Sequence, residues 1–392
     1  SDSDGDSDSD GDSDSDGDSD SDGDSDSDGD SDSDGDSDSD DTDPPRTCDS
    51  AATLREAGEC MNPPMLIGTA LGKVYDNDRL SFNNESVKAV AKKEFNYITC
   101  ENEMKWGVID ENGWGEGQAI VDWAKGAGLK IKGHTLVWHS QLGATGDITS
   151  ESELRPKVLT HIDDMFSHFK DLHSWDVVNE AVETTDNTGK ADDTGNGDAH
   201  MRKTVFYRLL GDEYIEEMFD YARENAPTNA KLYYNDYSID ADNAKAEFVY
   251  DIIKGMVDKG MPIDGVGFQM HIGPPNNVTV TGKTVADNMK RFTDLGLEVL
   301  ISEMDINMCG GDFEEDEQVQ LYHDVVEACV QNHKCTAITF WGVDDAASWL
   351  NTFEGSKCNG ANSRSLLFKD CKNGDCTRKE TYKAVLKALT GK

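Results

Sequence analysis

Along most of this chain, short runs rich in β-branched and aromatic residues alternate with longer segments of helical periodicity. The two patterns predict strands and helices, because side chains repeat every two residues in a strand and every 3.6 in a helix. The predicted strands are 65–70, 95–100, 130–137, 174–178, 231–235, 265–270, 298–302 and 336–341. The predicted helices are 85–94, 117–127, 151–171, 203–225, 241–259, 284–295, 314–333 and 379–389.

Eight strand–helix repeats in succession indicate an α/β protein built from parallel βα units. Two architectures fit this pattern, a closed (β/α)8 TIM barrel and an open, doubly wound sheet. A nucleotide-binding open sheet has a glycine-rich phosphate loop after an early strand, and neither GxGxxG nor a Walker loop occurs here. The repeat number favours the barrel, whose functional residues lie at the C-terminal ends of the strands.

Residues 1–43 form a distinct segment, a Ser/Asp/Gly repeat with 22 acidic residues and no apolar or basic residue. Without apolar side chains to bury, the segment is predicted to be a disordered linker that precedes one catalytic domain, residues 44–392. Asp6, Asp8, Asp10 and Gly11 match the start of a calcium loop, but Gly17 stands where such a loop needs a glutamate. A solvated spacer to another module is therefore preferred over a calcium site.

The charge balance excludes two classes of partner. The chain has 79 acidic and 36 basic residues, and the 57 acidic residues outside 1–43 leave the rest at a net charge of −21. Nucleic acids and anionic membrane surfaces are bound through Lys and Arg, so neither is expected as a partner. No apolar run approaches the roughly 20 residues of a membrane span. We expect a monomer. We also expect any export signal to lie outside this sequence.

Nine cysteines occur, at positions 48, 60, 100, 309, 329, 335, 358, 371 and 376. Their odd number leaves at least one unpaired, and no pair has the CxxC spacing of a common zinc site. Short separations such as that of Cys371 and Cys376 suit local disulfides in an oxidising, extracellular compartment. Buried free thiols are the alternative at this point.

Polar and aromatic side chains are concentrated at the ends of the predicted strands. In a barrel these residues converge on one rim, where amides and carboxylates can bind hydroxyl groups and indole rings can stack on sugar rings. The set is therefore typical of a carbohydrate site. Its members are Glu101, Asn102, Lys105, His134, Trp138, Asn179, Glu180, Asn235, Tyr237, Gln269, His271, Glu303, Asp305, Trp341 and Trp349.

Glu180 and Glu303 follow the fourth and seventh predicted strands, from which they can face each other across the barrel mouth. Cleavage of a glycosidic bond needs two such carboxyl groups, one to protonate the leaving oxygen and one to attack or to activate water. An isolated glutamate is usually a solvated surface charge. Two glutamates after apolar strands, among Asn, His and Trp, favour catalysis instead.

Seven strings carry a resemblance to a known family: FNYITCENEMKW, GHTLVWHSQ, WDVVNEAV, YYNDYS, GVGFQMHI, VLISEMDI and ITFWGVDDAASW. In this order, and over roughly residues 60–390, they resemble glycoside hydrolase family 10, the retaining endo-β-1,4-xylanases. The resemblance implies a (β/α)8 barrel that is secreted, acts on xylan and xylo-oligosaccharides and needs neither a metal ion nor an organic cofactor.

The resemblance also implies individual roles. Glu180 is similar to the family's acid/base and Glu303 to its nucleophile. Asn179 is expected to bind the 2-hydroxyl of the sugar being cleaved, and His271, with Asp305 behind it, to orient the nucleophile. Double displacement then requires Glu303 to be ionised and Glu180 to be protonated in the free enzyme.

The remaining residues divide between the two sides of the cleft. Residues similar to ligands of the non-reducing-side sugars are Glu101, Asn102 and Lys105. Residues similar to those around the reacting ring are His134, Trp138, Gln269, Trp341 and Trp349. Asn235 and Tyr237 match a motif nearer the leaving group. Two segments depart from the family pattern, LGATGD after WHSQ and the acidic, glycine-rich insert 186–199, and both are expected at the leaving-group side.

Cys329 and Cys335 resemble a family disulfide beside the eighth strand. Cys309–Cys358, Cys48–Cys60 and Cys371–Cys376 would complete four local pairs and leave Cys100 free and buried beside Glu101.

Other aromatic and ionisable side chains are expected to have structural roles. Trp123 and Trp175 are predicted core residues, and His139 is predicted to support Trp138. The predicted surface histidines are His161, His168, His173, His200, His323 and His333.

Rival functions are an endoglucanase or mannanase on the same barrel and a non-catalytic carbohydrate-binding protein. The ENEMKW and GHTLVWH strings argue against an endoglucanase or mannanase. The presence of both glutamates argues against a non-catalytic protein.

Overall fold

The computed structural model describes residues 46–73, 81–276 and 279–392. The chain divides into two units, residues 1–42 and 43–392, and the described residues belong to the second. The predicted linker 1–43 and its calcium-loop alternative lie outside the described residues.

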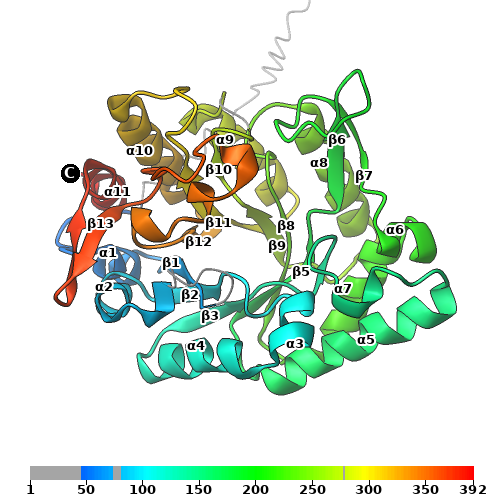
Figure 1. Ribbon diagram of the computed structural model, residues 1–392. Helices are drawn as coiled ribbons and strands as arrows, with labels where there is room; N and C mark the ends of the chain where they lie inside the picture. Colours follow the sequence, from blue (N-terminus) through cyan, green and yellow to red (C-terminus); the bar gives the residue numbers. More distant parts are fainter. Residues whose placement is uncertain (1–45, 74–80, 277–278) are drawn as a thin grey trace, which may run out of the picture. The chain divides into compact units, whose positions relative to one another are not determined.

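Eight parallel strands close into a barrel (Figure 1). β1 hydrogen-bonds to β2 on one side and to β12 on the other, with Gly68 opposite Tyr97 and Ile67 opposite Ile338, so the sheet has no free edge. The barrel strands are β1 (Leu66–Leu71), β2 (Tyr97–Cys100), β3 (Lys130–Gly133), β5 (Ser174–Asn179), β8 (Lys231–Asp236), β9 (Gly265–Phe268), β11 (Glu298–Ile306) and β12 (Cys335–Phe340). The predicted (β/α)8 fold is confirmed.

Helices surround this barrel, and their apolar faces pack on the outward side chains of the strands. The principal helices are α2 (Glu85–Glu94), α4 (Gly115–Gly126), α5 (Glu151–His168), α7 (Tyr214–Asn225), α8 (Ala244–Asp258), α9 (Gly282–Asp294), α10 (Glu315–Gln331) and α11 (Glu380–Thr390). Side-chain caps mark where several begin, because an amide or hydroxyl oxygen accepts from otherwise unpaired N–H groups. Asn84 caps α2, Asn243 caps α8, and Thr281 forms a capping box with Thr284 on α9.

Shorter elements decorate this frame, and the sequence patterns did not predict most of them. The additional helices are α1 (Leu54–Cys60), α3 (Trp106–Asn112) and α6 (Val205–Leu210), with 3-10 turns η1 (Ser81–Asn83), η2 (Gly143–Thr145), η3 (Asp345–Ala347), η4 (Trp349–Asn351) and η5 (Glu354–Ser356). The additional strands are β4 (Val137–Trp138), β10 (His271–Ile272) and two hairpins, β6 (Val182–Thr185) with β7 (Asp198–Met201) and β13 (Phe368–Lys372) with β14 (Asp375–Arg378). The predicted helix 203–225 is divided into α6 and α7 at Gly211, which has a φ of +86°.

The barrel interior has an apolar layer and a polar layer. Tyr97, Tyr233, Leu300 and Ala337 fill the first. Nearer the C-terminal ends of the strands lie buried polar side chains: Lys132, Asp176, Asn235 and Ser302. The polar layer is the floor of the mouth.

Irregular pairing in two strands aims extra side chains at this mouth. The register of β5 against β8 shifts between Asp176 and Val178, and that of β11 against β12 shifts between Ile301 and Met304. In a regular strand, residues an odd number apart point to opposite faces. The shifts let Asp176 and Asn179 on β5, and neighbouring Ser302 and Glu303 on β11, all contact the interior network.

All four expected disulfides form, and they link Cys48 to Cys60, Cys309 to Cys358, Cys329 to Cys335 and Cys371 to Cys376. Cys100 is free and buried, as expected. Among the described residues, no helix combines the length and apolarity needed to cross a membrane.

Candidate active site

A cavity of about 430 Å³ opens at the C-terminal ends of the strands. Twelve of the predicted site residues line it: Asn102, Lys105, His134, Trp138, Asn179, Glu180, Tyr237, Gln269, His271, Glu303, Trp341 and Trp349. Asn235 and Asp305 lie behind this lining, hydrogen-bonded to its members, and Glu101 is not part of it. The sequence analysis missed several lining residues: His139, Ser140, Gln141, Asp193, Arg202, Pro275, Asn276 and Phe353.

Glu303, near the end of β11, is a buried carboxylate among donors and positive charges. Asn235 Nδ2 donates to its Oε1 at 2.7 Å, and His271 Nε2 lies 3.3 Å from its Oε2. Burial alone would raise the pKa of Glu303, but the charges and hydrogen bonds of His134, His271 and Lys132 lower it to about 2. Glu303 is therefore ionised at neutral pH.

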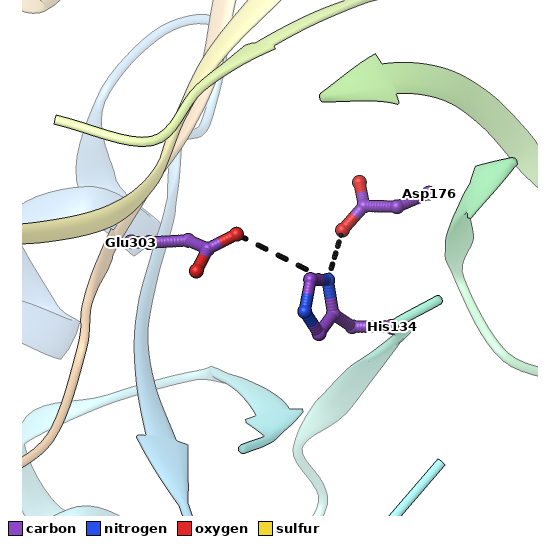
Figure 2. A group of neighbouring side chains, drawn as sticks. All are labelled: His134, Asp176 and Glu303. Carbon is purple, nitrogen blue, oxygen red and sulfur yellow. Dashed lines mark hydrogen bonds and ion pairs between the residues drawn. The ribbon is translucent and has the colours of Figure 1, made fainter. Parts of the chain in front are cut away.

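Beneath Glu303, a buried charge network extends into the barrel. Asp176 Oδ2 lies 2.8 Å from both Lys132 Nζ and His134 Nδ1, and His134 Nδ1 lies 4.0 Å from Glu303 Oε1 (Figure 2). His134, Asp176 and Glu303 have donor atoms close enough for a metal ion. The Lys132 ammonium lies against the same Asp176 oxygen, so its positive charge already balances the negative charge of that carboxylate.

His271 is held between two carboxylates. Its Nδ1 lies 2.9 Å from Asp305 Oδ1, and Asp305 Oδ2 accepts from Trp349 Nε1 at 2.8 Å. Burial would lower the pKa of His271, but Asp305 and Glu303 raise it to about 10. The imidazolium therefore donates to both carboxylates, and Trp349 fixes the far one.

Glu180 follows β5 with a backbone φ of +55°, a conformation that residues other than glycine rarely adopt and that costs free energy. Its Oε2 lies 2.8 Å from Trp138 Nε1 and 2.8 Å from His139 Nε2, and its Oε1 accepts from Gln269 Nε2 at 2.9 Å. Burial favours the protonated carboxyl, but His139, Gln269 and Trp138 hold the pKa of Glu180 well below its usual range.

These contacts change two expectations. Glu180 was expected to be protonated in the free enzyme, whereas three donors converge on its carboxylate and favour the ionised form. His139 was expected to act only through Trp138, whereas its ring nitrogen contacts Glu180 directly. The sequence analysis assigned a sugar contact to Trp138 and gave the adjacent His139 only a supporting role.

A chain of amides connects the two glutamates. Asn235 Nδ2 donates both to Glu303 Oε1 and to Asn179 Oδ1, and Gln269 Nε2 donates to Asn179 Oδ1 at 3.2 Å and to Glu180. Because Asn235 presents its nitrogen to Glu303, Asn179 must face it with its carbonyl oxygen. The Asn179 nitrogen is thereby left on the Glu180 side, 3.3 Å from Oε1.

One wall of the cavity carries Asn102 and Lys105, which follow β2. Lys105 Nζ donates to Asn102 Oδ1 at 2.9 Å and lies 4.6 Å from the centre of the Trp138 ring. Burial lowers the pKa of Lys105, although Glu303, Glu101 and Glu180 oppose this effect. An ammonium, an amide and an indole on one wall suit a sugar with several hydroxyl groups.

The opposite wall carries Tyr237 and two residues that no sequence pattern indicated, Arg202 and Asp193. Arg202 donates to the Tyr237 hydroxyl at 2.9 Å, and the Tyr237 hydroxyl donates to Asp193 Oδ1 at 3.0 Å. Asp193 lies in the loop between β6 and β7, within the insert 186–199, and Arg202 directly follows β7. The insert was expected at the edge of the cleft, and its Asp193 is part of the cavity lining.

Of the residues assigned structural roles, His161 is not at the surface. Its ring is buried and stacks on Trp106 with centroids 4.0 Å apart, and burial lowers its pKa to about 3. The surface prediction failed because α3, which carries Trp106, was not anticipated. Trp175 is fully buried and Trp123 packs on the core, as predicted.

A (β/α)8 barrel with two carboxylates in one polar, aromatic-lined cavity is the arrangement of a glycoside hydrolase. The model of glycosyl hydrolase family 10 matches residues 65–388, and the chain belongs to this family. The resemblance seen in the seven sequence strings is confirmed.

Individual family members are similar to this chain over most of their length. Endo-1,4-beta-xylanase B of Thermotoga neapolitana is 38% identical over 279 residues, which are 69% of this chain and 76% of that protein. Endo-1,4-beta-xylanase A of Humicola insolens is 35% identical, with 76% of this chain and 75% of that protein covered. The crystal structure of xylanase 10B from Thermotoga maritima is 34% identical, with a TM-score of 0.71 and coverage of 86% of this chain and 98% of that one. The structure from Thermotoga petrophila RKU-1 in complex with xylobiose is also 34% identical, with a TM-score of 0.70 and coverage of 86% and 97%.

The raised pKa of His271 predicts a pH-dependent stability. Between the ordinary value of 6.5 and the folded value of about 10, the folded protein binds one more proton here than the unfolded chain. This contribution is present in full below 6.5 and is lost as pH rises through 10, by up to about 1.4 kcal/mol per pH unit. Urea unfolding across this range measures it.

The decline should be absent in a His271→Asn variant. It should persist in His168→Asn, because the pKa of the exposed His168 is lowered and the group does not titrate in this window. A parallel decline in wild type and His271→Asn would contradict the assignment.

Proposed function

We propose that this chain cleaves internal β-1,4-xylosidic bonds of xylan by a retaining double displacement, with Glu303 as nucleophile and Glu180 as acid/base. The observation that carries the proposal is a deeply buried carboxylate, Glu303, kept ionised by His271 and Asn235 within the same cavity as Glu180. The cavity of this family member has room and polarity for xylo-oligosaccharides, and a relative from Thermotoga petrophila is known in complex with xylobiose.

In the first step, Glu303 attacks the anomeric carbon while the leaving oxygen takes a proton from the Glu180 side. Glu180 Oε2 lies 2.8 Å from His139 Nε2. Sugar binding excludes water, and a drier site favours the neutral carboxyl over the carboxylate, so binding shifts the pKa of Glu180 upward and the carboxyl takes up a proton. Glu180 becomes an acid when the cleft is occupied.

In the second step, Glu303 is esterified and has lost its negative charge. The proton on Glu180 is then less favoured, and the hydrogen bonds from Trp138 and Gln269 stabilise the carboxylate again. Glu180 can now accept a proton from the water that releases the sugar. The same hydrogen bonds that depress the pKa of the resting group thus prepare it as a base.

Around the reacting ring, the proposed contacts follow from the lining. Asn179 would bind the 2-hydroxyl, with its amide oriented by Asn235 and Gln269. The residues proposed to enclose the ring are His134, Trp138, Gln269, His271, Trp341 and Trp349. Asn102 and Lys105, with Glu101 further out, would bind sugars toward the non-reducing end, and Tyr237 would contact the leaving group.

The setting of the enzyme belongs to the same proposal. Four disulfides suit an oxidising compartment, so we expect a secreted protein. We expect it to act as a monomer, with residues 1–43 as a spacer to another module.

The substrate class is tested by reducing-sugar release from xylan, carboxymethylcellulose and mannan in parallel. We expect release from xylan and none above background from the other two polymers. Equal release from carboxymethylcellulose would support the endoglucanase alternative, and binding of xylan without release would support the non-catalytic one.

Glu303→Ala should lower kcat on xylan at least about a thousandfold, because no other group can form the glycosyl-enzyme. Azide, small enough for the space left by the side chain, should restore turnover and give a product of inverted configuration. The configuration is read by NMR of the glycosyl azide. Retention of configuration, or substantial activity without azide, would contradict the nucleophile assignment.

Glu180→Ala should have a substrate-dependent effect. Xylan has a poor leaving group and should react roughly 10²–10⁴-fold more slowly. An aryl xylobioside has a good leaving group, so it should still form the glycosyl-enzyme and then stall, which gives a burst of phenol. Azide should rescue this variant with retention, opposite to its effect on Glu303→Ala. Similar losses on both substrates would argue against an acid/base role.

A further inference from the structure

The loop between β6 and β7 is docked on the chain that follows β8. Ser238 Oγ donates to the carbonyl oxygen of Asp193 at 2.7 Å, and the Lys245 backbone N–H donates to that of Gly195 at 3.0 Å. Gly195 has a φ of +82°, and a Cβ there would lie 2.9 Å from the Ser238 carbonyl oxygen. The close approach therefore requires glycine, and it holds Asp193 against the cavity.

Three charged groups surround Tyr237 at this junction. Its hydroxyl donates to Asp193 Oδ1 at 3.0 Å and accepts from Arg202 at 2.9 Å. Lys245 Nζ lies 3.1 Å from the centre of its ring and 2.7 Å from Asp236 Oδ1, with both ionic groups buried. The ring is therefore fixed at its hydroxyl and over one face.

These contacts decide what Tyr237 can offer to a ligand. The hydroxyl proton is committed to Asp193, and Lys245 covers one face of the ring. Burial first, together with nearby carboxylates, keeps the pKa of Tyr237 well above its usual value, so the proton that bonds to Asp193 stays in place. What remains for the cavity is the free side of the ring, a surface suited to the apolar face of a sugar.

The position of this wall identifies the sugar. Arg202 Nε donates to the backbone carbonyl of Glu180 at 3.0 Å, which joins the wall to the residue proposed to protonate the leaving oxygen. β8, which carries Tyr237 at its end, flanks β5 on the side away from β3 and β2, so Lys105 lies across the cavity. A sugar that leaves from Glu180 departs along the Tyr237 wall.

Resting on the function proposed above, we infer that Asp193 is a positioning residue for the leaving-group sugar. It fixes the Tyr237 hydroxyl from the insert loop, so that the ring is held ready to stack on that sugar. The insert thereby contributes to recognition on one side of the cleft and leaves the non-reducing side unchanged.

The test compares two substrates that differ only in the leaving group, xylotriose and β-xylobiosyl fluoride. Asp193→Ala should lower kcat/KM for xylotriose about tenfold, the scale of one lost hydrogen bond, and leave the fluoride within about twofold. Asp193→Asn keeps an oxygen for the Tyr237 hydroxyl and should restore most of the xylotriose value. Asp186→Ala is a control in the same loop, because the Asp186 carboxylate bonds to the nearby Thr188, Gly189 and Lys190, and it should change the kcat/KM of neither substrate.

A double-mutant cycle tests whether Asp193 acts through the Tyr237 hydroxyl. In a Tyr237→Phe background, Asp193→Ala should have no further effect on xylotriose, because the contact is already absent. Equal losses on both substrates, no loss on either, an Asn variant no better than Ala, or additive effects in the cycle would each overturn the proposal. If the wild type hydrolysed neither substrate, the proposed function itself would fail.

Discussion

Asp176 carries a negative charge at the centre of the barrel, with no exposure to solvent. A buried charge is costly unless it is paired, and removal of one partner from such a pair typically costs about 3–5 kcal/mol. Lys132 and His134 supply the pairing from β3 and the residue after it, each at 2.8 Å. Since the three groups come from adjacent strands, the pairing fixes their relative register as well as their charge. The floor under Glu303 is therefore a buried network of paired charges and not a solvent-filled space.

The two glutamates above this floor have opposite surroundings, although both are held ionised in the empty cavity. The pKa of Glu303 is lowered chiefly by the neighbouring cationic groups His134, His271 and Lys132. Glu180 is held ionised by hydrogen bonds from His139, Gln269 and Trp138. A change in hydration can therefore alter Glu180 while it leaves Glu303 ionised. Two identical side chains are thus kept ionised in different ways, Glu303 mainly by charged neighbours and Glu180 mainly by hydrogen bonds.

Much of this arrangement could be predicted from the sequence. All eight barrel strands were found, because Val, Ile, Leu and aromatic residues recur with few interruptions, and the rule that parallel strands end on one rim brought Glu180 and Glu303 together. Lys132 and Asp176 are charged residues within predicted strands, and the sequence analysis did not recognise them as a buried pair. The shifted registers gave no usable signal, because a bulge depends on how two distant strands pair and not on either sequence alone.

The irregular connections show the same limit. Arg202 and Asp193 reach the cavity through a hairpin whose strands, β6 and β7, have four residues each, too few for a repeat of two to stand out in the sequence. The short helix α3 was equally hidden, and with it the partner of His161. In each case the environment of a residue depends on a segment whose secondary structure could not be predicted from the local sequence pattern.

A chain with four disulfides and one further cysteine is exposed to scrambling, because a free thiolate can attack a disulfide sulfur. Cys100 is removed from this chemistry by its position at the end of β2, where it is fully buried. Burial raises the pKa of its thiol well above the usual value, so the reactive thiolate is scarce. The odd cysteine is thus shielded for as long as the barrel stays closed. Its rate of alkylation therefore reports how often the barrel opens at β2, the strand that leads to Asn102 and Lys105.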